Sequence, residues 1–300
     1  MPVRWPRKPR IAIVGAGNLA GALAVALHAA GYRIGEIISR DKKPSLRRAA
    51  GLAKQVGASV IRINQARIDR ARIDQARIQA KIVWFCVPDS AIASTGNSLR
   101  NSIDWTGKTA LHSSGALTAD ALTILGRKGA TLASVHPMMT FVPGSRPSFV
   151  GIPFAIEGDK MAASVARHIV RDLKGQAYPI RAEDKAAYHA WGTFASPLVT
   201  ALLATTEHAA AAAGIKRKAA HKRVLPIIAQ TIANYSSCGA AEGFSGPLAR
   251  GDVETVKRHL QALAKFPVER EVYVALAKAA LRYLPVKQKD KLRKLLGLKS

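Results

Sequence analysis

The residues of this 300-residue chain with the clearest ligand-binding spacing lie near its start, in the stretch IAIVGAGNLAGALAVAL. Gly15, Gly17 and Ala20 follow a short β-branched run and open an apolar helical stretch, which is the G-x-G-x-x-A spacing. The first glycine permits a tight turn, the second lets the backbone approach a pyrophosphate, and the alanine lets the helix pack closely on the strand. Backbone N–H groups at such a helix start, here at Asn18 and Leu19, bind phosphate. The spacing predicts a dinucleotide-binding turn.

About twenty residues further on, Ser39 and Arg40 occupy the position where an acidic residue would bind the ribose 2′-hydroxyl of NAD. Serine and arginine can donate to a 2′-phosphate, which a carboxylate would repel. Asp41 comes next and is the argument for NAD. We expect NADP in preference to NAD. Val87 and Pro88, in VPDSAI, end a further predicted strand, and ligands of open α/β sheets bind at such ends.

A proton donor or acceptor is the second requirement, because hydride transfer to or from a carbonyl or imine also moves a proton. His136, in SVHPMMTF, is the first candidate, since an ordinary histidine titrates near pH 6.5. Ser113 and Ser114 end the preceding predicted strand. Ser114 could orient the histidine or bind the substrate oxygen, and Ser113 is a candidate cofactor contact. The alternative is a histidine that only caps the strand end beside Pro137.

Candidate substrate contacts lie in the second half of the chain. Tyr188 and His189 open the first helix after the predicted strands, and Arg250, in GPLARGD, could bind an anionic substrate bidentately. Core packing explains Tyr188 nearly as well. Asp252 is interpreted as a helix cap.

The elements that must position these residues alternate over the first 180 residues. Apolar or β-branched runs predict strands at residues 10–15, 34–39, 81–87, 109–113, 131–136, 154–157 and 176–180, with helical stretches such as 18–30, 44–56 and 161–173. Alternating strands and helices predict a doubly wound, mainly parallel α/β sheet of Rossmann type. Later segments read as helices, with a kink or boundary at Pro197. We expect an NADP-binding domain over residues 1–181 and an all-helical domain for substrate binding and dimerisation over residues 182–300.

A tandem five-residue repeat, QARID-RARID-QARIQ, occupies residues 65–79. Ile68, Ile73 and Ile78 would form no stripe on a helix and would alternate between the two faces of a strand. We therefore interpret the repeat as a surface insertion in a loop, with a basic interaction arm as the alternative, and expect its removal to leave the fold unchanged.

Composition excludes several classes of protein. A hydrophobic content of 48% excludes a disordered or collagen-like chain, and Cys86 and Cys238 have neither disulfide-framework nor metal-ligand spacing, so no metal site is expected. The 46 Lys and Arg residues exceed the 19 Asp and Glu residues, which gives a net charge of +27. That charge suits phosphorylated ligands or nucleic acid. The basic clusters are dispersed and only 6% of residues are aromatic, so no nucleic-acid partner is expected.

The apolar start resembles a signal peptide but is interrupted by glycines, and no other segment reads as a membrane span, so we expect a cytoplasmic protein without a membrane partner.

Seven segments, in order, resemble a family of Rossmann-fold NADP oxidoreductases with a C-terminal helical domain of unknown function: GAGNLA, ISRD, VPDSAI, LHSSGAL, SVHPMMTF, YHA and SGPLARGDVETVKRHL. The family is similar in plan to pyrroline-5-carboxylate reductases, 6-phosphogluconate-type dehydrogenases and prephenate dehydrogenases. The resemblance implies a helical domain that forms a homodimer. Prephenate dehydrogenases have a similar HPM element with an active-site histidine, which supports His136.

Two departures limit the resemblance. GTFASPL replaces the GSGPAY of pyrroline-5-carboxylate reductases, and the lysine and asparagine one helical turn apart in β-hydroxyacid dehydrogenases have no clear equivalent at residues 185–189. We therefore expect an NADP-dependent oxidoreductase that transfers a hydride between NADP(H) and a small carbonyl, imine or hydroxy-acid substrate. The alternatives are a non-catalytic NADP-binding sensor, which would not use His136, and a basic nucleic-acid-binding protein.

Overall fold

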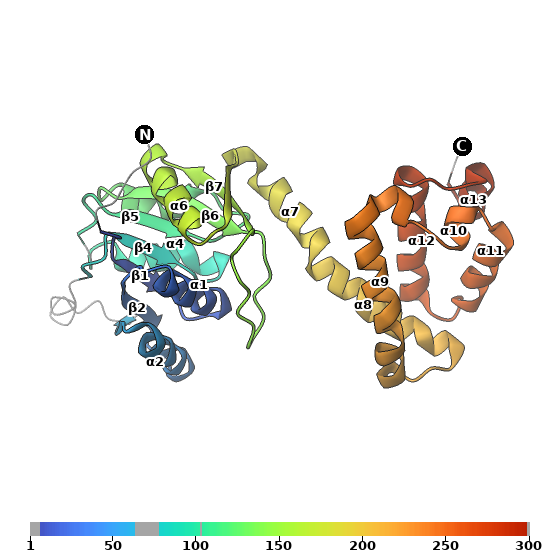
Figure 1. Ribbon diagram of the computed structural model, residues 1–300, viewed down its shortest axis with the longest axis horizontal. Coiled ribbons are helices and arrows are strands. Elements are labelled where there is room, and N and C mark those ends of the chain that lie inside the picture. The colour runs from blue at the N-terminus through green and yellow to red at the C-terminus, as the bar shows by residue number, and fades with distance from the viewer. Residues whose placement is uncertain (1–6, 64–77, 103, 299–300) are drawn as a thin grey trace. The chain divides into compact units, whose positions relative to one another are not determined.

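The computed structural model describes residues 7–63, 78–102 and 104–298 of the chain (Figure 1). The chain divides into two compact units, Met1–Thr193 and Phe194–Ser300. The division falls inside helix α7 (Lys185–Ala195), beyond the boundary at residue 181 that the sequence suggested. Each unit is described by itself.

An eight-stranded sheet, as far as the described residues go, forms the centre of the first unit in the order β3-β2-β1-β4-β5-β6-β7-β8. Neighbouring strands are parallel except β6 and β7, which are antiparallel. The first six strands have the order of doubly wound dinucleotide-binding sheets, in which the crevice lies between β1 and β4. The predicted fold class, a Rossmann-type α/β unit followed by helices, is confirmed. The strands are β1 (Ile11–Val14), β2 (Ile34–Arg40), β3 (Ser59–Ile63), β4 (Ile82–Phe85), β5 (Thr109–His112), β6 (Thr131–Pro137), β7 (Pro153–Gly158) and β8 (Gln176–Pro179).

Helices bury both faces of this sheet. Ile11 and Ile13 face a core shared with α1 (Asn18–Ala29), α2 (Lys43–Val56) and α6 (Lys160–Asp172). Ala12 and Val14 face the opposite core, shared with α4 (Asp89–Leu99), η1 (Ala119–Leu122) and α5 (Thr123–Gly126). Burial on both sides explains why IAIV and IVWF are continuous apolar runs instead of alternating ones.

Strand β3 was missed by the sequence analysis. It lies at the edge of the sheet and pairs only with β2 among the described strands, and its five residues are exposed or half-buried. The polar residues Ser59 and Arg62 interrupt its apolar pattern, because an edge strand does not need to be buried on both faces.

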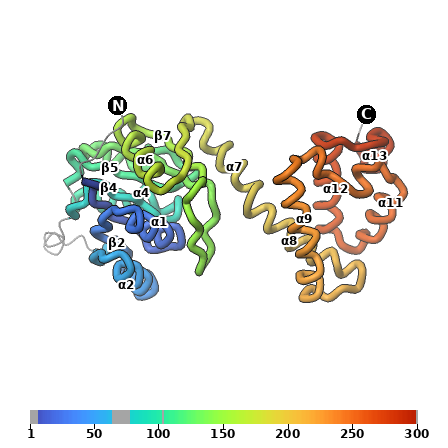
Figure 2. Tube along the Cα trace, in the orientation of Figure 1, coloured from blue at the N-terminus to red at the C-terminus, as the bar shows by residue number. Residues whose placement is uncertain are grey.

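The second unit is helical (Figure 2). Pro197 starts α8 after a break at Ser196, so it marks a helix boundary, which was one of the two predicted outcomes. The core of the unit lies between α11, α12 and α13, with Val256, Leu281 and Leu292 in its centre. Leu292 belongs to α13, in the basic segment near the end of the chain, and its side chain is fully buried. In the first unit, the short 3-10 helix η2 (Ala182–Asp184) precedes α7. The helices of the second unit are α8 (Pro197–Ala209), the 3-10 helix η3 (Ala210–Ala213), α9 (Arg217–Gly243), α10 (Pro247–Arg250), α11 (Val253–Ala262), α12 (Pro267–Tyr283) and α13 (Lys289–Leu295).

The length and polarity of the helices can be compared with those of a membrane span. None of the described helices is by itself both long and apolar enough to cross a membrane. One pair of helical segments, Ala182–Ala213 and Arg217–Arg250, satisfies the length and composition requirement when taken together, but it is bent by 117° at the break between them.

The end of the pentapeptide repeat takes part in the fold. Residues 64–77 lie outside the described residues, but the side chain of Ile78 is only 8% exposed and packs in the core beneath α4. The side chain of Gln79 accepts a 2.9 Å hydrogen bond from Arg10, and Lys108 donates to the carbonyls of Ile78 and Ala80. The prediction that residues 65–79 could all be removed is therefore wrong for the last two, which have contacts that a five-residue period does not reveal.

Shortening the repeat tests this assignment. Ile63 pairs with Arg40, whereas Gln79 contacts Glu36 four residues earlier on the same strand, so the connection must cover at least roughly 13 Å, or about four residues. Deleting residues 65–74 leaves that length, and we expect the melting temperature to stay within a few degrees. Deleting residues 65–79 removes the Ile78 and Gln79 contacts, and we expect a loss of about 2–4 kcal/mol in the free energy of unfolding, measured by urea denaturation. Equal stability of the two deletion variants would contradict the assignment.

Candidate functional site

The predicted phosphate-binding turn lies between β1 and α1. Gly15 has φ +106°, and a Cβ built on it would lie 2.5 Å from the carbonyl oxygen of Cys86, so only glycine fits between β1 and β4. Gly17 precedes α1 with open space where a side chain would be, and Ala20 is fully buried against the sheet. Within the described residues no side chain caps α1 and no acidic residue lies in its first turn. The turn therefore presents free N–H groups and the positive end of the helix dipole to an anion.

The other predicted cofactor contacts surround this turn. Ser39 and Arg40 end β2, next to Gly15, whose N–H donates to Ile38 O at 2.8 Å. Arg40 is exposed, whereas the Ser39 side chain is buried and its hydroxyl donates to the carbonyl of Arg40. Leu19 packs partly into the core. Val87 and Pro88 follow β4, and Val87 Cγ1 lies 3.2 Å from the position of a Gly15 Cβ.

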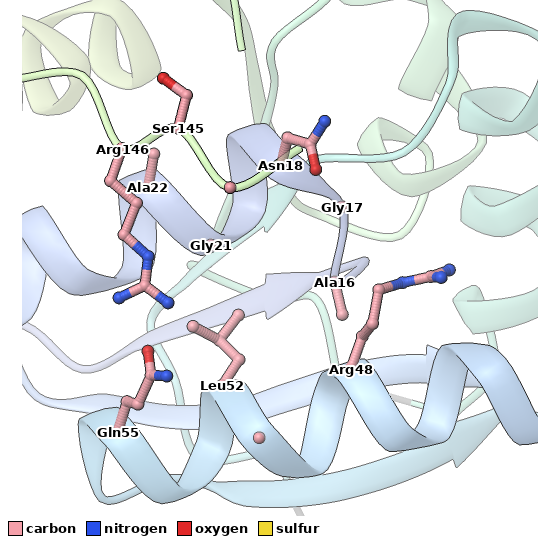
Figure 3. A pocket seen from close by; sticks show the side chains of 12 residues that line it. Ala16, Gly17, Asn18, Gly21, Ala22, Arg48, Leu52, Gln55, Ser145 and Arg146 are labelled. Atoms are coloured by element: carbon pink, nitrogen blue, oxygen red, sulfur yellow. The ribbon is translucent and has the colours of Figure 1, made fainter. Parts of the chain in front are cut away.

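A pocket of about 260 Å³ opens beside the turn, between α1, α2 and the loop that joins β6 to β7 (Figure 3). Its walls include Gly17 and Gly21 of the turn and α1, Leu52 of α2, and the loop residue Gly144. The side-chain amide of Asn18 donates to Phe141 O at 3.0 Å and so joins this loop to α1. Two arginines that the sequence analysis did not select, Arg48 and Arg146, also line the pocket.

The HSSGAL segment forms a tightly bonded turn after β5. His112 is fully buried; one ring nitrogen bonds Thr118 O at 2.9 Å and the other accepts from the Ser114 N–H. The Ser114 hydroxyl donates to Asp89 Oδ2 at 2.8 Å and accepts from the N–H groups of two following residues. The Ser113 hydroxyl accepts from the indole of Trp84 at 2.8 Å. The Ser114 hydroxyl therefore holds the turn with its donor and acceptors, whereas the Ser113 hydroxyl accepts one bond and keeps its O–H to donate.

Lys185, the first residue of α7, is the main functional candidate that sequence reasoning missed. Its side chain is fully buried, and its ammonium donates to Ser134 Oγ at 2.7 Å and to Ser114 O at 3.1 Å. In the described part of the chain no carboxylate lies within 4 Å of it. Burial lowers the pKa of Lys185 from its ordinary value. The one available signal was its position four residues before His189, a spacing the sequence analysis set aside.

His136 lies near the carboxyl end of β6 and contacts two residues of α7. Its Nδ1 is 2.9 Å from the hydroxyl of Tyr188, and its ring meets that of His189 edge-on at 6.0 Å between centroids. Gly115 makes room for this arrangement, since a Cβ there would lie 2.9 Å from His136 Nε2 and 2.6 Å from His189 Cδ2. The ring of Tyr188 also meets the ring of Tyr178 of β8 edge-on, at 6.3 Å between centroids.

Charge and burial keep His136 neutral. Burial, then the positive charge of Lys185, then His189, lower its pKa to about 4. The sequence analysis expected an ordinary value near 6.5, which is too high for this environment. Burial also raises the pKa of Tyr188 well above its ordinary value, and that of buried His112 falls to about 4. At neutral pH both histidines are uncharged, so His136 can exchange its two tautomers without becoming an imidazolium.

The predicted site residues form two groups, with one exception. Gly15, Gly17, Asn18 and the end of β2 form the phosphate end. His136, Ser114, Tyr188 and His189 lie together at the HSSGAL turn, in the same unit. Arg250 ends α10 in the second unit, where it is exposed, and its role in substrate binding stays a prediction.

Comparison with protein families gives two matches. Residues 10–109 match the family described as NADP oxidoreductase coenzyme F420-dependent, and residues 152–280 match a domain of unknown function (DUF2520). The chain is therefore an NADP-dependent oxidoreductase, and NADP is its cofactor. The segment between the two matches, residues 110–151, carries the HSSGAL turn, His136 and the pocket loop.

Solved structures share the fold over most of the chain. A Bacteroides fragilis protein assigned to the NADP oxidoreductases is 23% identical, with a TM-score of 0.72, and covers 91% of this chain and 97% of that chain. A Thermotoga maritima protein is 22% identical, with a TM-score of 0.67, over 90% and 96%. A reductive aminase from Aspergillus terreus, solved with NADPH and ethyl-5-oxohexanoate, is 15% identical, with a TM-score of 0.59, over 96% and 99%. Comparison with curated proteins finds no match.

Because His112 and His136 are neutral in the folded chain, we expect the folded state to lose stability in acid. Their pKa values are about 4 in the folded chain and about 6.5 in an unfolded one, so their stabilising contribution is complete above pH 6.5 and is lost as the pH falls toward 4. Over that window His136→Gln should reduce the slope of unfolding free energy against pH by up to about 1.4 kcal/mol per pH unit. Urea titrations between pH 7 and pH 5 measure this slope. His28→Gln, on the exposed side of α1, is the control, and an equal effect of the two variants would exclude this role for His136.

Proposed function

We propose that this NADP oxidoreductase transfers a hydride between NADP(H) and a small carbonyl, imine or hydroxy-acid substrate, with His136 and Tyr188 handling the proton. The observation that carries the proposal is the 2.9 Å contact between His136 Nδ1 and the Tyr188 hydroxyl, in the same unit as the phosphate-binding turn. Solved structures with the same fold support the substrate class, since they include imine reductases and a reductive aminase.

The residues present fit a dinucleotide. Gly15 leaves no room for a side chain between β1 and β4, and the uncapped start of α1 offers N–H donors to a pyrophosphate. Gly17, Asn18, Leu19 and Ala20 would hold the phosphates, and Ser39 and Arg40 the 2′-phosphate. The cofactor supplies or accepts the hydride, and every other requirement of the reaction falls to the chain.

The proton can move along a chain of two side chains. When His136 Nδ1–H donates to the Tyr188 hydroxyl, Nε2 is free to accept a proton. When the hydrogens reverse, Nε2 carries a hydrogen that it can donate. Tyr188 exchanges its own hydroxyl hydrogen with water, and the half-buried ring of Tyr178 packs edge-on beside it. The relay serves either direction of the reaction and needs no charged imidazolium, which the low pKa of His136 disfavours.

Lys185 supports this chemistry without contacting it. Its charge is among the causes that lower the pKa of His136, after burial. Its bonds to Ser134 and Ser114 fix the end of β6 against the HSSGAL turn. We assign Lys185 as a positioning residue.

The alternative remains a sensor that binds NADP and carries out no reaction. It would keep the turn and use His136 only to join α7 to β6. Within the described residues His136 makes its one hydrogen bond through Nδ1, so Nε2 can exchange a proton with a substrate, and this favours the enzyme.

We further propose that the second unit forms a homodimer, and we expect the protein to act in the cytoplasm. Within the described chain no residue of α8 is buried, and only Ala220 is buried among the 27 residues of α9. Helix α9 is broken at Gly239, so its longer arm, residues 217–238, is about 33 Å long, and with α8 it presents a face of the order of the 800 Å² per partner that a stable interface buries. A twofold contact between identical faces is the commonest way to cover it. The large exposed apolar residues of α8 and α9 are Leu198, Val199, Leu225, Ile227, Ile232 and Tyr235.

Catalysis is tested by replacing the relay residues. NADPH oxidation is first screened against cyclic imines, ketones with amines, and keto acids. His136→Ala should then lower kcat about a hundredfold and Tyr188→Phe about tenfold, with NADPH affinity unchanged, because neither side chain lies at the phosphate turn. His28→Ala is the control. Full activity of His136→Ala would exclude the relay, and tight NADPH binding without any substrate would favour the sensor.

Cofactor preference tests Arg40. NADPH should bind at least about tenfold more tightly than NADH, equivalent to about 1.4 kcal/mol, because Arg40 can pair with the 2′-phosphate. Arg40→Ala should remove most of this preference in calorimetric titrations. Equal affinity of the unmodified protein for both cofactors would contradict the assignment of Ser39 and Arg40.

Oligomeric state tests the dimer. Sedimentation equilibrium of the full chain, without detergent, should give about twice its 32.0 kDa mass. Ile227→Asp combined with Ile232→Asp should give a monomer with an unchanged circular dichroism spectrum, whereas Glu254→Lys, exposed on α11, should remain dimeric. A monomeric unmodified protein would refute the dimer, and a need for detergent would indicate a membrane contact in its place.

A further inference from the structure

Two arginines at the pocket have no assigned role in the function proposed above. Arg48 lies on the exposed side of α2, and Arg146 lies on the loop between β6 and β7, about a hundred residues apart in sequence. Both line the pocket beside the phosphate-binding turn. Figure 3 shows Arg48 next to Ala16 and the guanidinium of Arg146 over α2 near Gln55, so they border the pocket from two sides. Among residues 7–63, 78–102 and 104–298, neither guanidinium makes an ion pair or a side-chain hydrogen bond.

The loop that carries Arg146 is held in place by the fold. Phe149 is buried and packs on Phe154 and on Phe141, and the carbonyl of Phe141 accepts from the Asn18 amide on α1. Gly144 has φ +78°, and the Ser145 N–H donates to Val142 O, so the chain turns sharply just before Arg146. These contacts fix the position of the Arg146 backbone relative to the turn.

The wall of the pocket favours close approach of a ligand. Gly17, Gly21 and Gly51 contribute no side chains, and a Cβ at any of them would have no atom within 4 Å. Within the described residues the first turns of α1 and α2 carry no acidic residue. Two cations at a pocket without a nearby counter-charge, next to free helix N–H groups, make a site for a small polyanion.

We propose that Arg48 and Arg146 form a second phosphate-binding subsite, which holds a phosphate group of the dinucleotide in addition to the N–H groups of the turn. The proposal rests on the proposed binding of NADP at this turn. The phosphate is either the pyrophosphate, common to all nicotinamide cofactors, or the 2′-phosphate, which only NADP carries.

Matched arginine variants test the subsite. Arg48→Ala and Arg146→Ala are compared with Arg47→Ala, which removes the same charge from the neighbouring position of α2, outside the pocket. All three positions are exposed, so the fold should be unaffected. We expect Arg48→Ala and Arg146→Ala each to raise the Kd for NADPH about tenfold or more in calorimetric titrations, and Arg47→Ala to change it less than about twofold.

The choice of cofactor distinguishes the two sources of phosphate. An equal loss of affinity for NADPH and NADH assigns the pyrophosphate to the subsite, and a loss for NADPH alone assigns the 2′-phosphate. Either result supports the subsite. If Arg48→Ala and Arg146→Ala bind both cofactors as Arg47→Ala does, the subsite is refuted while NADP binding at the turn stands. If the unmodified chain binds neither cofactor, the proposed function itself fails.

Discussion

The ammonium group of Lys185 lies out of contact with solvent where β5, β6 and α7 meet, and the proposed relay depends on how it is held. A buried charge without hydrogen bonds is unfavourable by several kcal/mol, so its bonds to Ser134 and Ser114 must be kept. They fix the first turn of α7 against the sheet. Tyr188 lies one helical turn further on, and its hydroxyl therefore meets His136 at a defined distance.

The same charge influences the type of proton transfer available. A cation close to a half-buried histidine disfavours a second cation, so His136 stays neutral at physiological pH. A neutral imidazole still has one donor and one acceptor nitrogen, and the side chain bound to one nitrogen decides the character of the other. Tyr188 can therefore set whether Nε2 gives or takes a proton. The positive charge of Lys185 is thus one of the causes that keep His136 neutral.

The sequence predicted the sheet, the phosphate-binding turn and NADP because each has a local pattern: continuous apolar runs, glycine spacing, and polar residues at the end of β2. It missed Lys185 and Arg146 for the opposite reason. The contacts of Lys185 join residues 51 and 71 positions apart, and nothing local distinguishes a buried lysine from an exposed one. Ile78 was misjudged because a five-residue period predicts no shared face for the isoleucines of the repeat, whereas Ile78 alone is buried by its own contacts with the core. His136 was selected by residue type, but its pKa depends on neighbours distant in sequence.

Electrostatics links the two ends of the candidate site to the unusual composition of the chain. The turn, Arg40, Arg48 and Arg146 place helix N–H groups and guanidinium groups around one edge of the sheet, without an acidic residue in the described first turns of α1 and α2. Like charges held together destabilise a folded chain, and an anion that binds only the folded state relieves the repulsion. Binding of a phosphate-bearing ligand would relieve the repulsion among these arginines, which are three of the 46 Lys and Arg residues. It follows that cofactor binding and stability should be coupled most strongly at low ionic strength, where these charges are least screened.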